Sequence, residues 1–222
     1  MNQRRIDLAA PPLDLTTADD LTAAVEAANL VCFPTDTVYG VGGCRRPETV
    51  AAIAAVKGRQ MNKSREADKP LQVIFATLNL LLEEVPLEPR ISAAVRRLLP
   101  GPLTLVVPYP RGWSCPPPGE VGGVPTLGLR VPLWARGARL LAQLQVPLIA
   151  SSANRAGESP PRRLADVAPT VLAGCDLVCD GGQVDGRASS VVDLSRYETQ
   201  GVWRLLRAGA WDEARIASAL RA

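Results

Sequence analysis

A short apolar segment that ends at a proline most constrains how this chain can fold. Residues 30–33 are apolar without interruption, as in a buried strand, and Pro34 ends the run. Two threonines, an aspartate and a tyrosine follow within residues 35–39, and three glycines lie within residues 40–43. Because glycine lets a ligand approach the main chain closely, we expect a loop that places hydroxyl and backbone N–H groups at a pocket mouth. The spacing also allows an ordinary polar turn with a packed tyrosine.

The composition is that of a single globular domain. Of the 222 residues, 47% are hydrophobic and 21% charged, which is ordinary for a soluble protein. The net charge of +3 suits an anionic substrate or a weak nucleic-acid contact but requires neither. Apolar runs are too short to span a membrane, and residues 1–12 lack a signal-peptide core, so we expect a cytoplasmic protein without membrane contact.

The absence of histidine narrows the chemistry. With no histidine in the sequence, Ser-His-Asp triads, Cys–His pairs and histidine metal sites are excluded. The five cysteines are scattered, and no second pair joins Cys175 and Cys179 in a zinc set, so we expect buried free thiols. Any reaction must therefore use lysine, arginine, carboxylates, hydroxyls, amides or a carboxylate-held metal ion.

Apolar periodicity predicts helices and strands that alternate along the chain. Helices are expected from about Thr17, over 47–57, 91–99, 135–145 and 164–173, and from Asp212. Strands are expected over 30–33, 71–76, 103–107, 127–131, 147–150, 175–179, 190–194 and 202–206. A loop rich in proline and glycine over 108–125 is longer than a simple connection in a compact domain usually is. We predict one α/β (α+β) domain, 17–222, with a twisted mixed sheet and flanking helices, after a lead-in over 1–16.

A basic segment follows the second expected helix. Residues 57–70 carry five positive and two negative side chains, and Lys57 lies on the inward face of the last helical turn. Such a segment is often solvated surface, and Lys57 could extend to water, but the same charges suit a triphosphate. The spacing of its glycines and lysines fits no Walker A loop. We expect residues 60–69 to be mobile until ATP orders them, and Lys57→Ala to leave the fold intact.

Seven motifs, in order, resemble those of the YrdC-like family, whose core members are threonylcarbamoyl-AMP synthases. The first motif is Pro-Thr-Asp-Thr-Val-Tyr-Gly at 34–40. The others are Lys-Gly-Arg at 57–59, Lys-Pro-Leu at 69–71, Pro-Gly-Pro-Leu-Thr at 100–104, Gly-Leu-Arg-Val-Pro at 128–132, Ser-Ala-Asn at 152–154 with Gly157, and Ser-Ser-Val-Val-Asp at 189–193 with Leu-Arg-x-Gly at 206–209. One such motif is weak, but seven in the family's order are a specific signal.

The resemblance implies both a fold and a reaction. The fold would be a twisted mixed sheet around a large, positively charged cleft. The reaction would convert L-threonine, bicarbonate and ATP into threonylcarbamoyl-AMP and pyrophosphate. The product would pass to a TsaD-type tRNA threonylcarbamoyltransferase complex, which modifies the adenosine next to the anticodon. Mg²⁺ would enter with ATP, without a protein metal site or a tightly bound organic cofactor, and a weak tRNA contact stays open.

The resemblance also assigns residues. Those implied as catalytic are Lys57, Arg59, Ser152 and Asn154. Those implied as substrate-binding are Thr35, Tyr39, Lys69, Thr104, Arg130, Ser189 and Arg207. Lysine, arginine and Mg²⁺ can stabilise charge on the α-phosphate and the departing pyrophosphate. Since the carbamate of threonine is itself the nucleophile, no histidine is needed.

The chain departs from the family pattern in its details. Gln60, Ile74, Leu133, Trp134 and Ala156 stand where members often carry other residues, which leaves the threonine and adenine pockets open. We expect the short, single-domain form of the family. One alternative is an RNA-binding module, which is disfavoured because aromatic and basic residues do not interleave in the sequence. The other is a low-activity YrdC-like paralogue, which is disfavoured because all four residues implied as catalytic are present.

Overall fold

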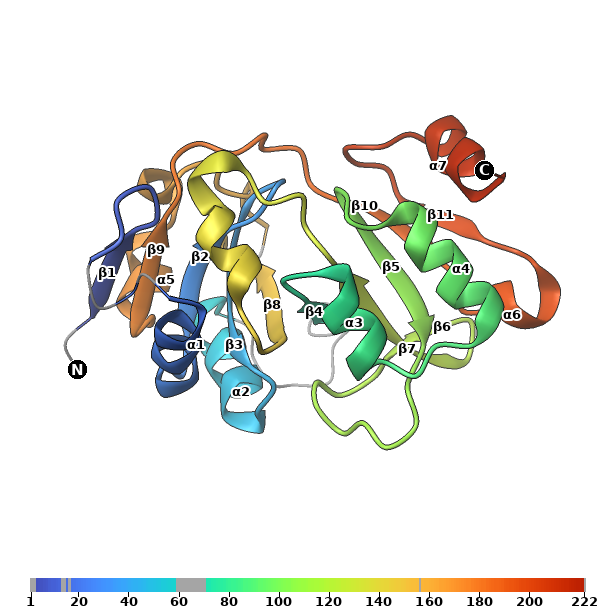
Figure 1. The fold of residues 1–222 in the computed structure, drawn as a ribbon, viewed down its shortest axis with the longest axis horizontal. Coiled ribbons are helices and arrows are strands. Elements are labelled where there is room, and N and C mark those ends of the chain that lie inside the picture. The colour runs from blue at the N-terminus through green and yellow to red at the C-terminus, as the bar shows by residue number, and fades with distance from the viewer. Residues whose placement is uncertain (1–2, 13–14, 16, 59–70, 156, 222) are drawn as a thin grey trace.

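A computed structural model describes residues 3–12, 15, 17–58, 71–155 and 157–221. Within them one mixed sheet runs through the molecule in the order β1-β9-β2-β3-β8-β4-β7-β5-β10-β11, with β6 paired to β7 (Figure 1). The strands are β1 (Arg4–Asp7), β2 (Val31–Pro34), β3 (Tyr39–Cys44), β4 (Gln72–Ile74), β5 (Leu103–Pro108), β6 (Gly119–Val121), β7 (Val124–Arg130), β8 (Leu148–Ser152), β9 (Leu177–Asp180), β10 (Ser190–Asp193) and β11 (Arg204–Arg207). The predicted α/β domain with a mixed sheet and flanking helices is confirmed.

Helices cover both faces of this sheet (Figure 1). They are α1 (Ala18–Ala27), α2 (Pro47–Val56), α3 (Leu78–Glu84), α4 (Pro89–Leu98), α5 (Pro169–Ala173), α6 (Tyr197–Gln200) and α7 (Glu213–Arg221), with 3₁₀ segments η2 (Arg136–Gln143) and η3 (Leu164–Asp166). In β2, Val31 and Phe33 belong to the apolar cluster under α1 and η2, while Cys32 belongs to the cluster under α2, α4, α5 and α7. An apolar run without alternation therefore suits a strand that is covered on both faces.

The start of α1 agrees with the helix that the sequence predicted from about Thr17. Thr17 is the N-cap, and its side chain accepts a hydrogen bond from the backbone N–H of Asp20. Leu21 and Val25 are fully buried, as the helical spacing predicted. The lead-in before this helix contributes β1, which pairs in parallel with β9, and it buries Ile6.

The glycines after Pro34 do not form a loop, so that expectation is wrong. They lie in β3, which pairs with β2 and β8, both antiparallel, and only residues 35–38 make the turn. A Cβ on Gly42 would lie 2.1 Å from the carbonyl oxygen of Ile149 and 2.9 Å from the Cα of Ala150. Glycine is therefore required at 42 because the β8 backbone leaves no room for a side chain.

Other elements differ from the expectations in ways that local chemistry explains. The expected helix at 135–145 is a 3₁₀ segment, and the one at 164–173 is divided into η3 and α5. Pro169 is the first residue of α5, and the residue before a proline is disfavoured in helical conformation. The long loop at 108–125 contains β6, and the short helices α3 and α6 were not predicted. No helix in the described part of the chain has the length and apolar character to cross a membrane.

The packing around Gly42 can be tested by alanine substitution. Gly42→Ala should lower the free energy of unfolding by roughly 1–3 kcal/mol, because the new methyl group overlaps backbone atoms that cannot rotate away. The matched control is Gly40→Ala, in the same strand and on the same face, where the nearest atoms would lie 3.5 Å away. Urea denaturation of both variants gives the comparison. Equal midpoints would contradict the close packing of β3 on β8.

Candidate active site

A cavity of about 720 Å³ lies over the middle of the sheet. Its floor includes Ala150 of β8, Gln72 of β4 and Gly128 of β7, which are direct neighbours in the strand register. Side chains at paired positions share one face of a sheet, so two small residues flank Gln72 on this floor. The cavity exists because the central strands carry glycine and alanine where larger side chains would fill the space.

The cavity collects most of the residues that the sequence motifs had selected. Those that line it are Thr35, Lys57, Thr104, Arg130, Ser152, Asn154, Ser189 and Arg207. Arg59, Lys69 and the expected lid at 60–69 lie outside the described residues. Tyr39 does not line the cavity. Segments far apart in the sequence therefore meet at one place.

Lys57 is the C-cap of α2 and is 2% exposed. Gly58 follows with φ of 64°, the left-handed conformation that commonly ends a helix. The Lys57 ammonium donates hydrogen bonds to the backbone carbonyl oxygens of Ser152 and, at 2.6 Å, Asn154. The side chain thus points inward instead of extending to water. Because its removal would leave buried carbonyl groups without these donors, the structure argues against the expectation that Lys57→Ala leaves stability unchanged.

The amide of Asn154 is oriented by its own loop. Its Nδ2 donates to the carbonyl oxygens of Arg155, at 2.9 Å, and Glu158, at 2.7 Å. Its Oδ1 is buried and has no hydrogen-bond partner among the described residues. Buried polar atoms in native proteins are nearly always satisfied. An acceptor left open in a cavity wall is therefore suited to an N–H or O–H group of a ligand.

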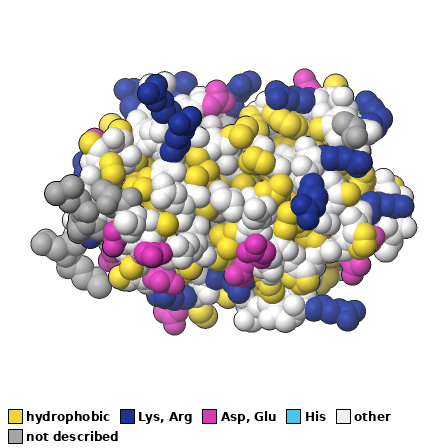
Figure 2. All heavy atoms as spheres, in the orientation of Figure 1, with side chains coloured by type: hydrophobic (Ala, Val, Ile, Leu, Met, Phe, Trp, Pro, Cys, Tyr) yellow, Lys and Arg dark blue, Asp and Glu magenta, His cyan; other side chains and the backbone are white. Residues whose placement is uncertain are grey.

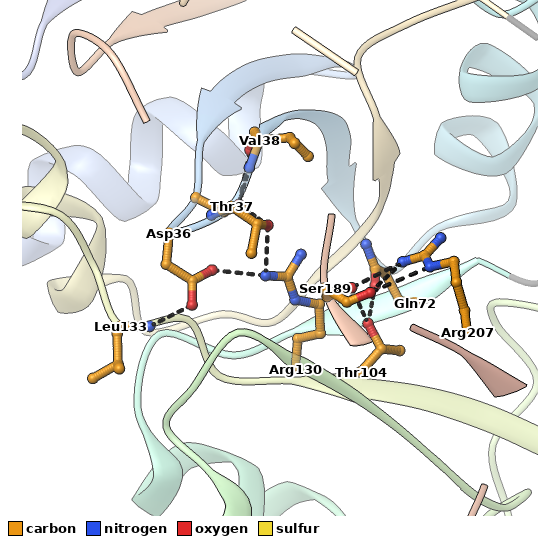
Figure 3. Close-up of polar contacts among 10 residues, drawn as sticks. Asp36, Thr37, Val38, Gln72, Thr104, Arg130, Leu133, Ser189 and Arg207 are labelled. Carbon is orange, nitrogen blue, oxygen red and sulfur yellow. Dashed lines mark hydrogen bonds and ion pairs between the residues drawn. The ribbon is translucent and has the colours of Figure 1, made fainter. Parts of the chain in front are cut away.

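A buried ion pair connects β7 to the β2–β3 turn. Arg130 Nη2 lies 2.7 Å from Asp36 Oδ1 and 3.0 Å from Thr37 Oγ1, and the two charged side chains are 3% and 8% exposed (Figure 3). Asp36 Oδ2 accepts from the backbone N–H of Leu133. Burial raises the pKa of Asp36 and lowers the pKa of Arg130, and their mutual attraction opposes both shifts. Arg130 Nε is buried and has no hydrogen-bond partner in the described structure.

Thr35 is used by the turn in which it lies. Its hydroxyl donates to the carbonyl oxygen of Val38 at 2.7 Å and accepts from the backbone N–H groups of Thr37 and Val38. The residue is 1% exposed. Thr35 lines the cavity, but these bonds indicate that its hydroxyl mainly fixes the turn that carries Asp36.

A second polar network, next to Arg130, joins further residues of the cavity lining (Figure 3). Arg207 Nη2 donates to the carbonyl oxygen of Ser189 at 2.8 Å and to its hydroxyl at 3.1 Å. The Ser189 hydroxyl lies 2.9 Å from that of Thr104, which donates to Gln72 Oε1 at 3.0 Å. Burial lowers the pKa of Arg207. Side-chain hydrogen bonds thus link four segments of the chain here.

Tyr39 has a supporting position behind the cavity. Its hydroxyl lies 2.8 Å from the carbonyl oxygen of Gly182 and 3.2 Å from Asp180 Oδ1, and it accepts from the backbone N–H of Gly181. Burial raises the pKa of the Tyr39 hydroxyl, so it stays neutral. The structure thus uses Tyr39 to hold the glycine-rich loop that leads to Ser189.

Motif reasoning did not assign Asp36, Thr37 or Gln72. Asp36 and Thr37 lie inside the first motif, and a polar aspartate directly after a buried strand was a usable signal. Gln72 carries no such signal, because only the strand register shows which face of β4 it occupies.

The charges around the cavity are mixed. Its lining includes four cationic side chains, Lys57, Arg130, Arg155 and Arg207, and two carboxylates, Glu120 and Glu158. On the face shown in Figure 2, lysine and arginine side chains are spread over the surface with acidic groups between them. Among the described residues no group of three or more histidine, cysteine or acidic side chains could hold a metal ion.

Comparison with known proteins identifies the family. A family model described as "Telomere recombination" and labelled Sua5_yciO_yrdC matches residues 23–209, most of the chain. This chain belongs to that family.

Relatives and solved structures extend the comparison. The chain is 34% identical over 177 residues to a threonylcarbamoyl-AMP synthase of Pyrococcus abyssi, a match that covers 78% of this chain and 49% of that protein. It is 30% identical over 200 residues to a threonylcarbamoyl-AMP synthase of Xanthomonas oryzae, covering 87% of this chain and 98% of that one. A structure of P. abyssi Sua5 complexed with L-threonine matches with a TM-score of 0.73 and 28% identity, over 99% of this chain and 61% of that one. The chain thus spans about half of the archaeal relative and nearly all of the bacterial one.

The buried ion pair makes a prediction about stability. Asp36→Ala should lower the free energy of unfolding by about 3–5 kcal/mol, because it leaves Arg130 buried without its counter-charge. The control is Asp166→Ala, which removes an ion pair to Arg163 whose side chains are 63% and 38% exposed, and it should cost less than about 1 kcal/mol. Chemical denaturation measures both variants. Similar small losses would contradict a structural role for the buried pair.

Proposed function

We propose that this chain is a threonylcarbamoyl-AMP synthase, which uses L-threonine, bicarbonate and ATP and releases pyrophosphate. The observation that carries the proposal is that Lys57, Ser152 and Asn154, from the motifs that resemble the family's catalytic residues, line one cavity. Family membership and relatives that bear this name support the same conclusion. The product would pass to a tRNA threonylcarbamoyltransferase complex. This proposal does not require that the chain itself contacts tRNA.

The chemistry fits a cavity in a chain that contains no histidine. Threonine and bicarbonate condense to a carbamate with loss of water, and a carbamate oxygen then attacks the α-phosphorus of ATP. The bond from the α-phosphorus to the bridging oxygen breaks, and pyrophosphate leaves with its electron pair. The protein's task is to position two anionic substrates and to stabilise the charge that develops between them.

The described residues divide this task. Arg130, whose Nη2 is fixed by Asp36 and Thr37, would present Nε and Nη1 to substrate oxygens. Asn154 would accept a hydrogen bond from threonine or its carbamate through Oδ1. Lys57 would hold the Ser152–Asn154 segment in place and add positive charge beside it.

The remaining assignments concern the triphosphate. Arg59 and Lys69 would contact it, and Thr104, Ser189 and Arg207 of the cavity lining would take part in holding it. Mg²⁺ commonly binds through substrate phosphates and one or two carboxylates, and Glu120 and Glu158 line the cavity, so entry with ATP fits the donors present. When bound, the ion would neutralise charge on the departing pyrophosphate.

The proposal predicts that pyrophosphate release from ATP needs threonine and bicarbonate together. Removing either substrate should reduce release to background, and serine should support it less well than threonine. A coupled pyrophosphate assay on the purified chain measures this, with mass spectrometry of the adenylate as a second readout. Equal ATP turnover without threonine would remove the assignment.

Arg59 gives a residue-level test of the same proposal. Arg59→Ala should lower kcat/KM by about two to three powers of ten if the guanidinium grips the triphosphate. Arg59→Lys should restore only part of this, since an ammonium cannot make the planar two-pronged contact. The control is Arg163→Ala, at an exposed position outside the cavity lining. Near-normal turnover of Arg59→Ala would show that the triphosphate is held elsewhere.

A further inference from the structure

The side chain of Gln72 stands in the middle of the cavity floor, at a position that none of the family motifs covers. It is half-buried, and its strand neighbours are Ala150 and Gly128, so no large side chain shields it. A Cβ on Gly128 would lie 3.4 Å from Gln72 Cβ and 3.3 Å from Thr104 Cγ2. The missing side chain at 128 therefore keeps both polar groups open to the cavity.

The hydrogen bonds that join Arg207, Ser189, Thr104 and Gln72 run in one direction. Arg207 can only donate, and its Nη2 donates to the Ser189 hydroxyl, so that oxygen serves as an acceptor. The hydrogen of Ser189, a residue that is 3% exposed, then needs an acceptor, and Thr104 Oγ1 lies 2.9 Å away. The hydrogen of Thr104 goes in turn to Gln72 Oε1 at 3.0 Å. The hydroxyl groups of Ser189 and Thr104 each accept one of these hydrogen bonds and donate one.

The direction of these hydrogen bonds determines which way the oxygen and the nitrogen of the Gln72 amide are turned. If the amide were reversed, its nitrogen would donate to Thr104, and Thr104 would donate to Ser189. The Ser189 hydrogen would then lack an acceptor among the described residues, at the cost of an unsatisfied buried donor. The favoured orientation turns the oxygen of Gln72 to Thr104 and leaves its NH₂ group without an acceptor in the described part of the chain.

We infer that Gln72 is a ligand-binding residue of this cavity, whose NH₂ group donates to an oxyanion of a substrate. The inference rests on the proposed function for the identity of the substrates and goes beyond it in naming the contact. The oxyanion would be a phosphate oxygen of the nucleotide or the carboxylate of the amino acid. Both have the required acceptors, and Arg130 and Arg207 on the same lining favour negative charge there.

Two substitutions separate the parts of this role. Gln72→Met keeps the length of the side chain but removes the donor, and should raise the Kd of one ligand about tenfold. Gln72→Glu still accepts from Thr104 but places a carboxylate where the NH₂ group was, so it should raise the same Kd further. Gln200→Glu, at an exposed position in α6, has the same charge change and should bind like the wild type.

The measurement is isothermal titration calorimetry of the full chain with Mg²⁺–ATP and with L-threonine in separate experiments. Weaker binding of the nucleotide alone identifies a phosphate contact, and weaker binding of threonine alone identifies a carboxylate contact. Wild-type affinity of Gln72→Met for both ligands overturns the inference, whatever Gln72→Glu does, and leaves the proposed function standing. Should Gln72→Glu fail to fold in thermal melts, Gln72→Met decides alone. A wild-type chain that binds neither ligand overturns the proposed function and this inference with it.

Discussion

The hydrogen bonds of Tyr39 hold together the segments from which the cavity is built. Its backbone N–H donates to the carbonyl oxygen of Pro161, and its carbonyl accepts from Ala153, so both ends of the loop that carries Asn154 are attached to β3. Its hydroxyl fixes the start of the glycine-rich loop that ends at Ser189. One residue at the start of a central strand thus sets the relative position of two site segments. A tyrosine in the first motif thus supports a cavity that it does not line.

The rest of the site depends on similar contacts between residues far apart in the chain. Arg130 reaches Asp36 across 94 residues, and Lys57 reaches Asn154 across 97. Both contacts are buried, where electrostatic interactions are stronger than in water and unpaired groups are costly. A cavity formed in this way is ordered before its substrates arrive. Such preorganisation is what charge stabilisation in a transition state requires.

The sequence was sufficient for the fold class and for most strands, because these depend on apolar periodicity, and most residues that its motifs selected do line the cavity. It was insufficient where packing between distant segments determines the local structure. The glycines at 40–43 suggested a loop, but Gly42 is explained by the backbone of β8, more than a hundred residues away. The position of Gln72 depends on the register of β4 between β7 and β8, and no local pattern encodes that. The resemblance implied that Tyr39 binds substrate, and the hydrogen bonds of its hydroxyl to Gly181 and Gly182 could not be read from its motif.

The two cavity arginines that carry printed hydrogen bonds, buried Arg130 and exposed Arg207, are held in different ways, and this suggests different tasks. Arg130 is paired with the carboxylate of Asp36, so its charge is largely neutralised while its direction is fixed. Arg207 bonds to Ser189 through neutral carbonyl and hydroxyl oxygens, which orient the guanidinium without cancelling its charge. Desolvation lowers the pKa of Arg207, but the residue as a whole is exposed. Its charge is therefore accessible to an anionic ligand. The network of Arg207, Ser189, Thr104 and Gln72 is suited to attract an anion, and the pair of Arg130 and Asp36 to orient one.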